Sequence, residues 1–163
     1  MKKLFLFALL LCFVACENKN PDTPETQGEY VDLGLSSGTK WKKVNEKNSN
    51  DENGFYTYEE AMEQFEQNLP TQEQWLELRN ECEWESSGMG YKVSGTNGNS
   101  IILPCAGYRD CAGGVNNVGS YGYYWSSTPY GSEQAWRLCF SPGWVMNMNH
   151  EDCCCGLSVR LVR

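Results

Sequence analysis

The residues best able to do chemistry lie together near the C-terminus, in the run His150-Glu151-Asp152-Cys153-Cys154-Cys155. Zinc is bound by imidazole, carboxylate and thiolate groups, and this run holds all three. Neighbouring side chains on an extended chain point to opposite faces, so only alternate members could share one ion. Neither CxxC nor HxxxH spacing is present here. The sequence therefore predicts no metal and no cofactor, and it favours a variable surface loop.

The run 150–155 also contains the one histidine that could act as a catalytic base. His150 is the only histidine of the chain, so a serine or cysteine nucleophile would depend on it as its base. It stands where we expect irregular structure rather than a rigid frame. The sequence therefore predicts no catalytic residues, and we do not expect an enzyme.

Cysteine usage leaves the pairing open. The chain has nine cysteines, of which Cys12 and Cys16 belong to the N-terminal segment. Seven remain, an odd number, so at least one stays unpaired or pairs between molecules. Cys105 and Cys111 flank a short loop and are our candidate disulfide, the alternative being two separate buried thiols. A bridge between adjacent cysteines of the run 153–155 would strain the intervening peptide.

Residues 1–16 are typical of a lipoprotein signal peptide. A basic start is followed by the apolar stretch 4–14, which is too short to span a bilayer. Ala15 directly before Cys16 resembles a bacterial lipobox, which implies cleavage before Cys16 and lipidation of its thiol. The alternative is an ordinary secretory signal with a chance cysteine. Lipidation would make this an outer-membrane lipoprotein of the cell envelope, periplasmic or surface-exposed, held to the membrane by Cys16.

Composition separates a tether from a folded domain. Residues 17–28 contain no large apolar side chain, so we expect a flexible tether, and residues 29–163 form the folded domain. The formal net charge is −8, and losing Lys2 and Lys3 with the signal would make it more negative. Such a surface repels phosphate, so nucleic acid is not an expected partner.

Two helices and several short strands are expected in the domain. Thr57 and Thr71 each begin a capping-box pattern ahead of apolar residues at helical spacing. Residues 30–35 and 39–44 alternate as strands, with Trp41 inward, and 90–94 and 100–104 flank an Asn-Gly hairpin turn. The sequence thus predicts an α+β fold, with two helices packed on a small, mostly antiparallel twisted sheet with long loops.

The C-terminal forty residues are expected to organise the sheet. We predict a strand at 123–125 ending in a turn at 126–129, then apolar runs at 135–140 and 144–148. Residues 157–162 alternate as a half-buried strand that should pair deep in the sheet. The residues assigned to the core of this region are Trp125, Trp136, Leu138, Val159 and Leu161.

A series of ordered motifs carries a family resemblance. They are Val31 to Thr39 (VDLGLSSGT), Leu69-Pro70-Thr71, Trp75, Asn97 to Ser100 (NGNS), Leu103-Pro104, Ala106 to Arg109 (AGYR), Tyr124 to Ser127 (YWSS) and Gly156 to Arg160 (GLSVR). Across residues 29–163 the chain resembles the Fibrobacter succinogenes major paralogous domain, a family of exported lipoproteins. The resemblance implies a C-type-lectin-like fold of the formylglycine-generating-enzyme variety. Some relatives are target proteins of diversity-generating retroelements, which vary residues near the C-terminus.

Three functional classes follow from the resemblance. A formylglycine-generating-type oxidase would bind copper through a cysteine pair, but Cys105 and Cys111 stand one residue too far apart. A calcium-dependent lectin would carry acidic calcium ligands, and Trp125-Ser126-Ser127 has no acidic partner. We therefore favour a metal-free binding or adhesion module for an unknown protein or glycan.

The binding surface of such a module would use aromatic rings and amides, as adaptable binding sites do. For Tyr123 and Trp144 a place in the core is the open alternative. The predicted ligand-binding residues are Tyr123, Tyr130, Trp144, Asn147, Asn149, His150 and Asp152.

Overall fold

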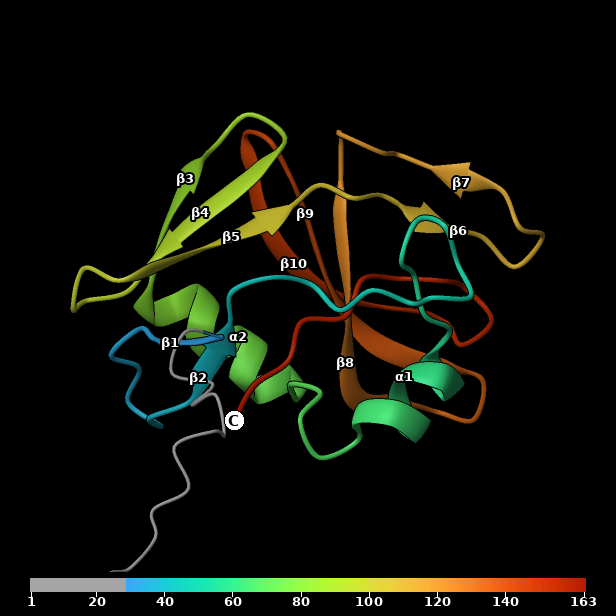
Figure 1. Ribbon diagram of the computed structural model, residues 1–163, viewed down its shortest axis with the longest axis horizontal. Helices are drawn as coiled ribbons and strands as arrows, with labels where there is room; N and C mark the ends of the chain where they lie inside the picture. The colour runs from blue at the N-terminus through green and yellow to red at the C-terminus, as the bar shows by residue number, and fades with distance from the viewer. Residues whose placement is uncertain (1–28) are drawn as a thin grey trace, which may run out of the picture.

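The computed structural model describes residues 29–163 and contains small antiparallel sheets with two short helices (Figure 1). The signal segment, the tether and Cys16 lie outside the described residues. The helices are α1 (Tyr58–Phe65) and α2 (Gln72–Glu81). The strands are β1 (Tyr30–Asp32), β2 (Lys40–Lys42), β3 (Glu83–Ser86), β4 (Gly90–Ser94), β5 (Ser100–Pro104), β6 (Tyr108–Arg109), β7 (Val115–Asn116), β8 (Gly122–Tyr130), β9 (Gln134–Ser141) and β10 (Trp144–Asp152).

The predicted α+β, C-type-lectin-like architecture is wrong for this chain. The described residues form four separate antiparallel sheets, β1–β2, β3–β4–β5, β6–β7 and β8–β9–β10, rather than one sheet under two helices. The helices have only 8 and 10 residues, whereas β8 and β10 have 9 residues each. The fold is mostly β because its strands run on through polar residues that we expected to form loops.

Both helices begin where the capping boxes predict. The hydroxyl of Thr57 accepts a hydrogen bond from the backbone N–H of Glu60, and the Glu60 carboxylate accepts one from the Thr57 N–H. Thr71 and Gln74 repeat this exchange at the start of α2. Each exchange satisfies two N–H groups that a helix start leaves without intrahelical partners.

The sheet β8–β9–β10 lies between two hydrophobic cores. Tyr124 pairs with Leu138 in the register of β8 and β9, and both belong to the core on the α2 side. Their neighbours Tyr123 and Cys139 point to the opposite face and join the second core. Trp75 of α2 packs edge-on against Tyr124 on the first side, with 5.8 Å between ring centroids. In Figure 1, α2 and α1 accordingly lie on opposite sides of β8.

Strand β8 continues through the expected turn at 126–129 by means of a bulge. The pairing of β8 with β9 shifts between Trp125 and Pro129 and then resumes up to Tyr130. The N–H of Gln72, at the start of α2, donates to the Thr128 hydroxyl at 3.0 Å. The hydroxyl-rich residues therefore join the helix start to the sheet while the strand continues.

The C-terminal segment is buried but is not the regular strand that its alternation predicts. It makes only isolated bridges, such as Leu157 with Tyr56 and Val162 with Trp41. The alternation predicted that one face of the strand, with Ser158, Arg160 and Val162, would be exposed to solvent. These three residues are instead as buried as Leu157, Val159 and Leu161. The segment is covered on both sides, and the buried Arg160 guanidinium donates hydrogen bonds to the Asn45 side chain and to the carbonyls of Lys42 and Ile102.

Other expectations are confirmed. Strands β1 and β2 pair antiparallel with Trp41 fully buried, and β4 and β5 form the predicted hairpin. Trp125, Leu138, Val159 and Leu161 are core residues. Neither of the two described helices is long and apolar enough to span a membrane.

Candidate functional site

Three aromatic rings from three strands meet at one end of the sheet β8–β9–β10, where β8 and β10 end and β9 begins. We call this the far end of the sheet. The rings of Tyr130 and His150 are stacked, with centroids 4.0 Å apart and planes inclined by 5°. Trp136 meets the Tyr130 ring edge-on at 5.2 Å. Tyr130 is 44% exposed, and His150 and Trp136 are half-buried. We call Tyr130, Trp136 and His150 the aromatic patch.

Polar side chains border the aromatic patch. Gln134 lies opposite both Tyr130 and Asp152 in the register of the three strands, so all three side chains share the face of the patch. The Gln134 amide donates a hydrogen bond to the Asp152 carboxylate, with 2.7 Å between Nε2 and Oδ1. This exposed pair places donors and acceptors beside an exposed ring.

Strand register explains why the patch assembles. His150 of β10 lies opposite Trp136 of β9, so their side chains point to the same face. The bulge in β8 absorbs the irregular residues after Trp125 and returns Tyr130 to that face. The positions are thus set by main-chain pairing, which makes the patch rigid compared with a loop.

The structure divides the predicted ligand-binding residues between the two faces of the sheet. Tyr130, His150 and Asp152 lie on the patch face, whereas Asn147 and Asn149 are exposed on the other. Tyr123 is only 8% exposed and belongs to the core, and burial raises its pKa. The guanidinium of Arg137, 4.7 Å from the centre of the Tyr123 ring, covers it.

Trp144 lies apart from the patch. It begins β10 beside the turn to β9 and is 52% exposed. Trp144 lies opposite Ser141 and His150 lies opposite Trp136, five residues apart on β9, which corresponds to about 17 Å along the strand. Trp144 and the patch therefore cannot share one small ligand.

Sequence reasoning missed Trp136 and Gln134. Trp136 was assigned to the core, but it is only half-buried and belongs to neither buried cluster. Both residues belong to the patch face through their pairing with β10. Alternation along each strand was visible in the sequence, but the register between strands was not.

The predicted Cys105–Cys111 disulfide is wrong. Cys111 pairs with Cys154, with 5.1 Å between their Cα atoms, and Cys105 is a free, buried thiol in the core on the α2 side. Cys105 follows β5 into the interior, whereas Cys111 lies in the exposed loop after β6. Proximity along the chain was therefore a poor guide to the pairing.

Within residues 29–163, one group of three side chains of metal-ligand type lies close together, although two of its members are bonded to each other in the disulfide. The sulfurs of Cys111, Cys154 and Cys155 all lie within 4.8 Å of one another. His150 and Asp152 do not belong to this group, because they lie on strand β10 beside Tyr130 and Gln134.

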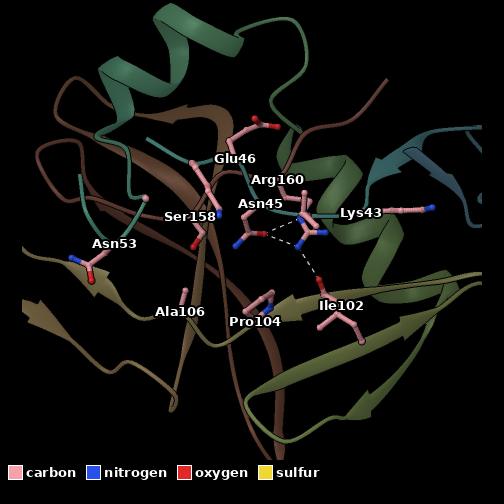
Figure 2. Close-up of a pocket in the computed structure, with 12 residues that line it drawn as sticks. Lys43, Asn45, Glu46, Asn53, Ile102, Pro104, Ala106, Ser158 and Arg160 are labelled. Carbon is pink, nitrogen blue, oxygen red and sulfur yellow. Dashed lines mark hydrogen bonds between the residues drawn. The ribbon is translucent and has the colours of Figure 1, made fainter. Parts of the chain in front are cut away.

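A separate pocket of about 290 Å³ lies between the loop 43–47, the end of β5 and the C-terminal segment (Figure 2). Its floor is Arg160, which is 1% exposed. The guanidinium donates to the Asn45 side chain and to the carbonyls of Lys42 and Ile102. Burial lowers the Arg160 pKa. The guanidinium donates its hydrogen bonds to neutral acceptors of the protein itself. We therefore interpret Arg160 as a residue that stabilises the fold and not as a binding site for an anion.

Comparisons with known proteins identify one family model. Residues 91–162 match the model described as Domain of unknown function (DUF8237). No curated protein and no solved structure matches the chain. The matched segment runs from β4 to the buried C-terminal segment, so it contains the aromatic patch and the Cys111–Cys154 disulfide.

Proposed function

We propose that this chain is an exported binding module whose ligand lies on the aromatic patch. The single observation that carries the proposal is the exposed Tyr130 ring, stacked on His150 and flanked by Trp136 on rigid strands. Exposed aromatic rings on a rigid frame offer contact area at a small entropic cost. Nothing in the core requires Tyr130 to be aromatic, because it lies outside both buried clusters.

A saccharide is the ligand class that fits this surface best. The apolar face of a pyranose ring can lie flat on an exposed aromatic side chain, and its hydroxyl groups need donors and acceptors beside that ring. The Gln134–Asp152 pair supplies both at the border of the patch. A protein ligand would usually bury about 800 Å² on each partner, far more than three side chains provide.

The patch offers no calcium site of the lectin kind among the described residues. Asp152 is hydrogen-bonded to Gln134, and the neighbouring Glu151 is paired with Arg137 at 3.0 Å on the other face. These carboxylates diverge rather than converge on a common point. We therefore propose binding that is independent of calcium.

A glycan array probed with the full chain tests this function. We expect defined glycans to bind equally well with and without a chelator. Tyr130→Ala should weaken binding by about tenfold or more, the usual effect of removing a central aromatic contact. Trp144→Ala is the matched control, because it removes an exposed ring from the same sheet about 17 Å away. No glycan bound, or equal losses in both variants, would refute the proposal.

Anchoring is a second part of the proposal. We infer that Cys16 carries a lipid, because it follows Ala15 at the end of an apolar segment and precedes a polar tether. Cys16→Ala should move the protein from the membrane fraction to the soluble fraction, as measured by fractionation and immunoblotting. Cys12→Ala is the control and should stay with membranes. A Cys16→Ala variant that remains attached would contradict lipidation.

A further inference from the structure

Three cysteine sulfurs form a cluster that the binding function does not use. Cys111 is bonded to Cys154, and the free thiol of Cys155 lies 3.5 Å from the Cys111 sulfur. Cys111 and Cys154 are exposed, whereas Cys155 is buried. A single cysteine of one segment therefore faces two adjacent cysteines of another.

Main-chain contacts hold the two segments together independently of the disulfide. Arg109 and Gly156 exchange two backbone hydrogen bonds, at 2.8 and 2.7 Å, just before Cys111 and just after Cys155. The loop around Cys111 is shaped by the Asp110 carboxylate, which accepts hydrogen bonds from the N–H groups of Ala112 and Gly114. The three sulfurs should therefore stay close whichever pair is bonded.

We propose that Cys111, Cys154 and Cys155 form a thiol–disulfide exchange site, in which Cys155 displaces Cys154 from Cys111. The Cys155 thiol loses its proton to solvent, and its thiolate attacks the sulfur of Cys111. The Cys111–Cys154 bond breaks as the Cys111–Cys155 bond forms, and the electron pair leaves on Cys154, which takes a proton from water. One disulfide and one thiol are present before and after, so no oxidant or reductant is needed.

The direction of attack follows from the geometry. Attack on Cys154 would create a bridge between adjacent residues, which strains the peptide between them. Attack on Cys111 creates a bridge between the same two segments that are already joined. The exchange thus moves the free thiol from a buried position to the exposed Cys154, where it can react with an external thiol reagent or disulfide.

The surroundings of Cys155 make the exchange slow at neutral pH. Burial raises the pKa of the Cys155 thiol, and the carboxylates of Glu151, Asp152 and Asp110 raise it further, while the N–H of Cys111 lowers it. Burial raises the pKa of Tyr108 of β6, and the nearby Cys155 raises it further. Because the thiolate is the nucleophile, the rate should rise with pH until Cys155 is ionised. An ionised Cys154 is also better solvated than an ionised Cys155, which favours the exchanged form at alkaline pH.

Differential labelling with localisation by mass spectrometry tests the exchange. The full chain is held at pH 7, 8 or 9, quenched with acid, and labelled with N-ethylmaleimide at one common pH. A Cys153→Ser background removes the neighbouring free thiol. The labelled fraction of Cys154 is measured against the time that the chain was held at each pH before the quench. We expect this fraction to grow about ten times faster for each pH unit. Cys155→Ser should leave Cys154 unlabelled at every pH.

A converse variant supplies a second readout. In Cys154→Ser there is no disulfide to exchange, so this variant is first incubated with oxidised glutathione as the oxidant. The Cys111 thiol should then become protected from the label, because a Cys111–Cys155 bond forms as oxidised glutathione is reduced to two glutathione thiols. The proposal is overturned if Cys111 becomes fully labelled in that variant. It is also overturned if Cys154 of the otherwise unchanged chain stays unlabelled at every pH, a result that does not depend on the folding of any cluster variant.

Discussion

The two ends of the sheet β8–β9–β10 have opposite characters, although the same three strands form both. Near the start of β8, Tyr124 and Trp125 are fully buried, each in one of the two cores. At the far end of the same strand, Tyr130 is 44% exposed and stacks on His150 without joining either core. Strand pairing is continuous between these ends apart from the bulge after Trp125.

The difference shows how one set of strands can separate stability from recognition. The buried end is fixed by α1, α2 and the C-terminal segment, so its side chains cannot change without cost. The far end is positioned by backbone hydrogen bonds, which do not depend on side-chain identity. Substitutions at the far end should therefore alter binding and leave the fold intact, and substitutions at the buried end should do the reverse.

The largest expected effect on stability is at Trp125. Its indole N–H donates to the Tyr56 carbonyl at 2.8 Å, and its ring packs edge-on against Tyr58. Trp125→Ala should lower the free energy of unfolding by about 3–5 kcal/mol, because it leaves a cavity and removes the hydrogen bond of the indole N–H. Chemical denaturation checks this value, with the exposed Trp144→Ala as the control. An unchanged midpoint would show that the buried end does not carry the stability.

Arg160 should have the next largest effect. Arg160→Met keeps much of the length of the side chain but leaves the Asn45 amide oxygen and the Lys42 and Ile102 carbonyls without their donors. Leaving buried acceptors unpaired should cost roughly 2–3 kcal/mol. Thermal unfolding measures the loss, and Arg163→Met, at the exposed C-terminal residue, is the matched control. Equal melting temperatures for the two variants would contradict a structural role for Arg160.

The smallest expected effect on stability belongs to the patch end. Tyr130→Ala combined with Asp152→Ala should change the free energy of unfolding by less than about 1 kcal/mol, since both side chains are exposed. The same denaturation experiment checks this prediction. A loss comparable to that of Trp125→Ala would mean that the far end is part of the structural frame, and the comparison between the two ends would fail.

Local signals in the sequence predicted local structure well. The Thr57 and Thr71 capping boxes and the Asn97-Gly98 turn each depend on a few neighbouring residues, and each is confirmed. The predicted turn at 126–129 and the predicted loop around His150 are instead parts of strands. Those polar residues are tolerated there because a bulge and an exposed face accommodate them.

The candidate site was harder to predict because it depends on contacts between strands. Asn149 and His150 are neighbours in sequence but point to opposite faces, and only the pairing with β9 shows which face holds Tyr130. The disulfide joins cysteines 43 residues apart, and no local pattern distinguishes Cys154 from Cys155 as its partner. Strand register and the pairing of distant cysteines depend on how the whole domain packs, so they become visible only in the structure.

The central claim, that ligand lies on the aromatic patch, is tested most directly by the indole N–H signals of the tryptophans. The chain has six tryptophans, and a ¹⁵N-labelled sample reports each indole separately. On titration with the strongest glycan from the array, the Trp136 signal should shift with saturation. The signals of Trp144 and of the buried Trp41, Trp75 and Trp125 should stay in place. A saturating shift of Trp144 with Trp136 unmoved would place the ligand at the other end of the sheet and contradict the account.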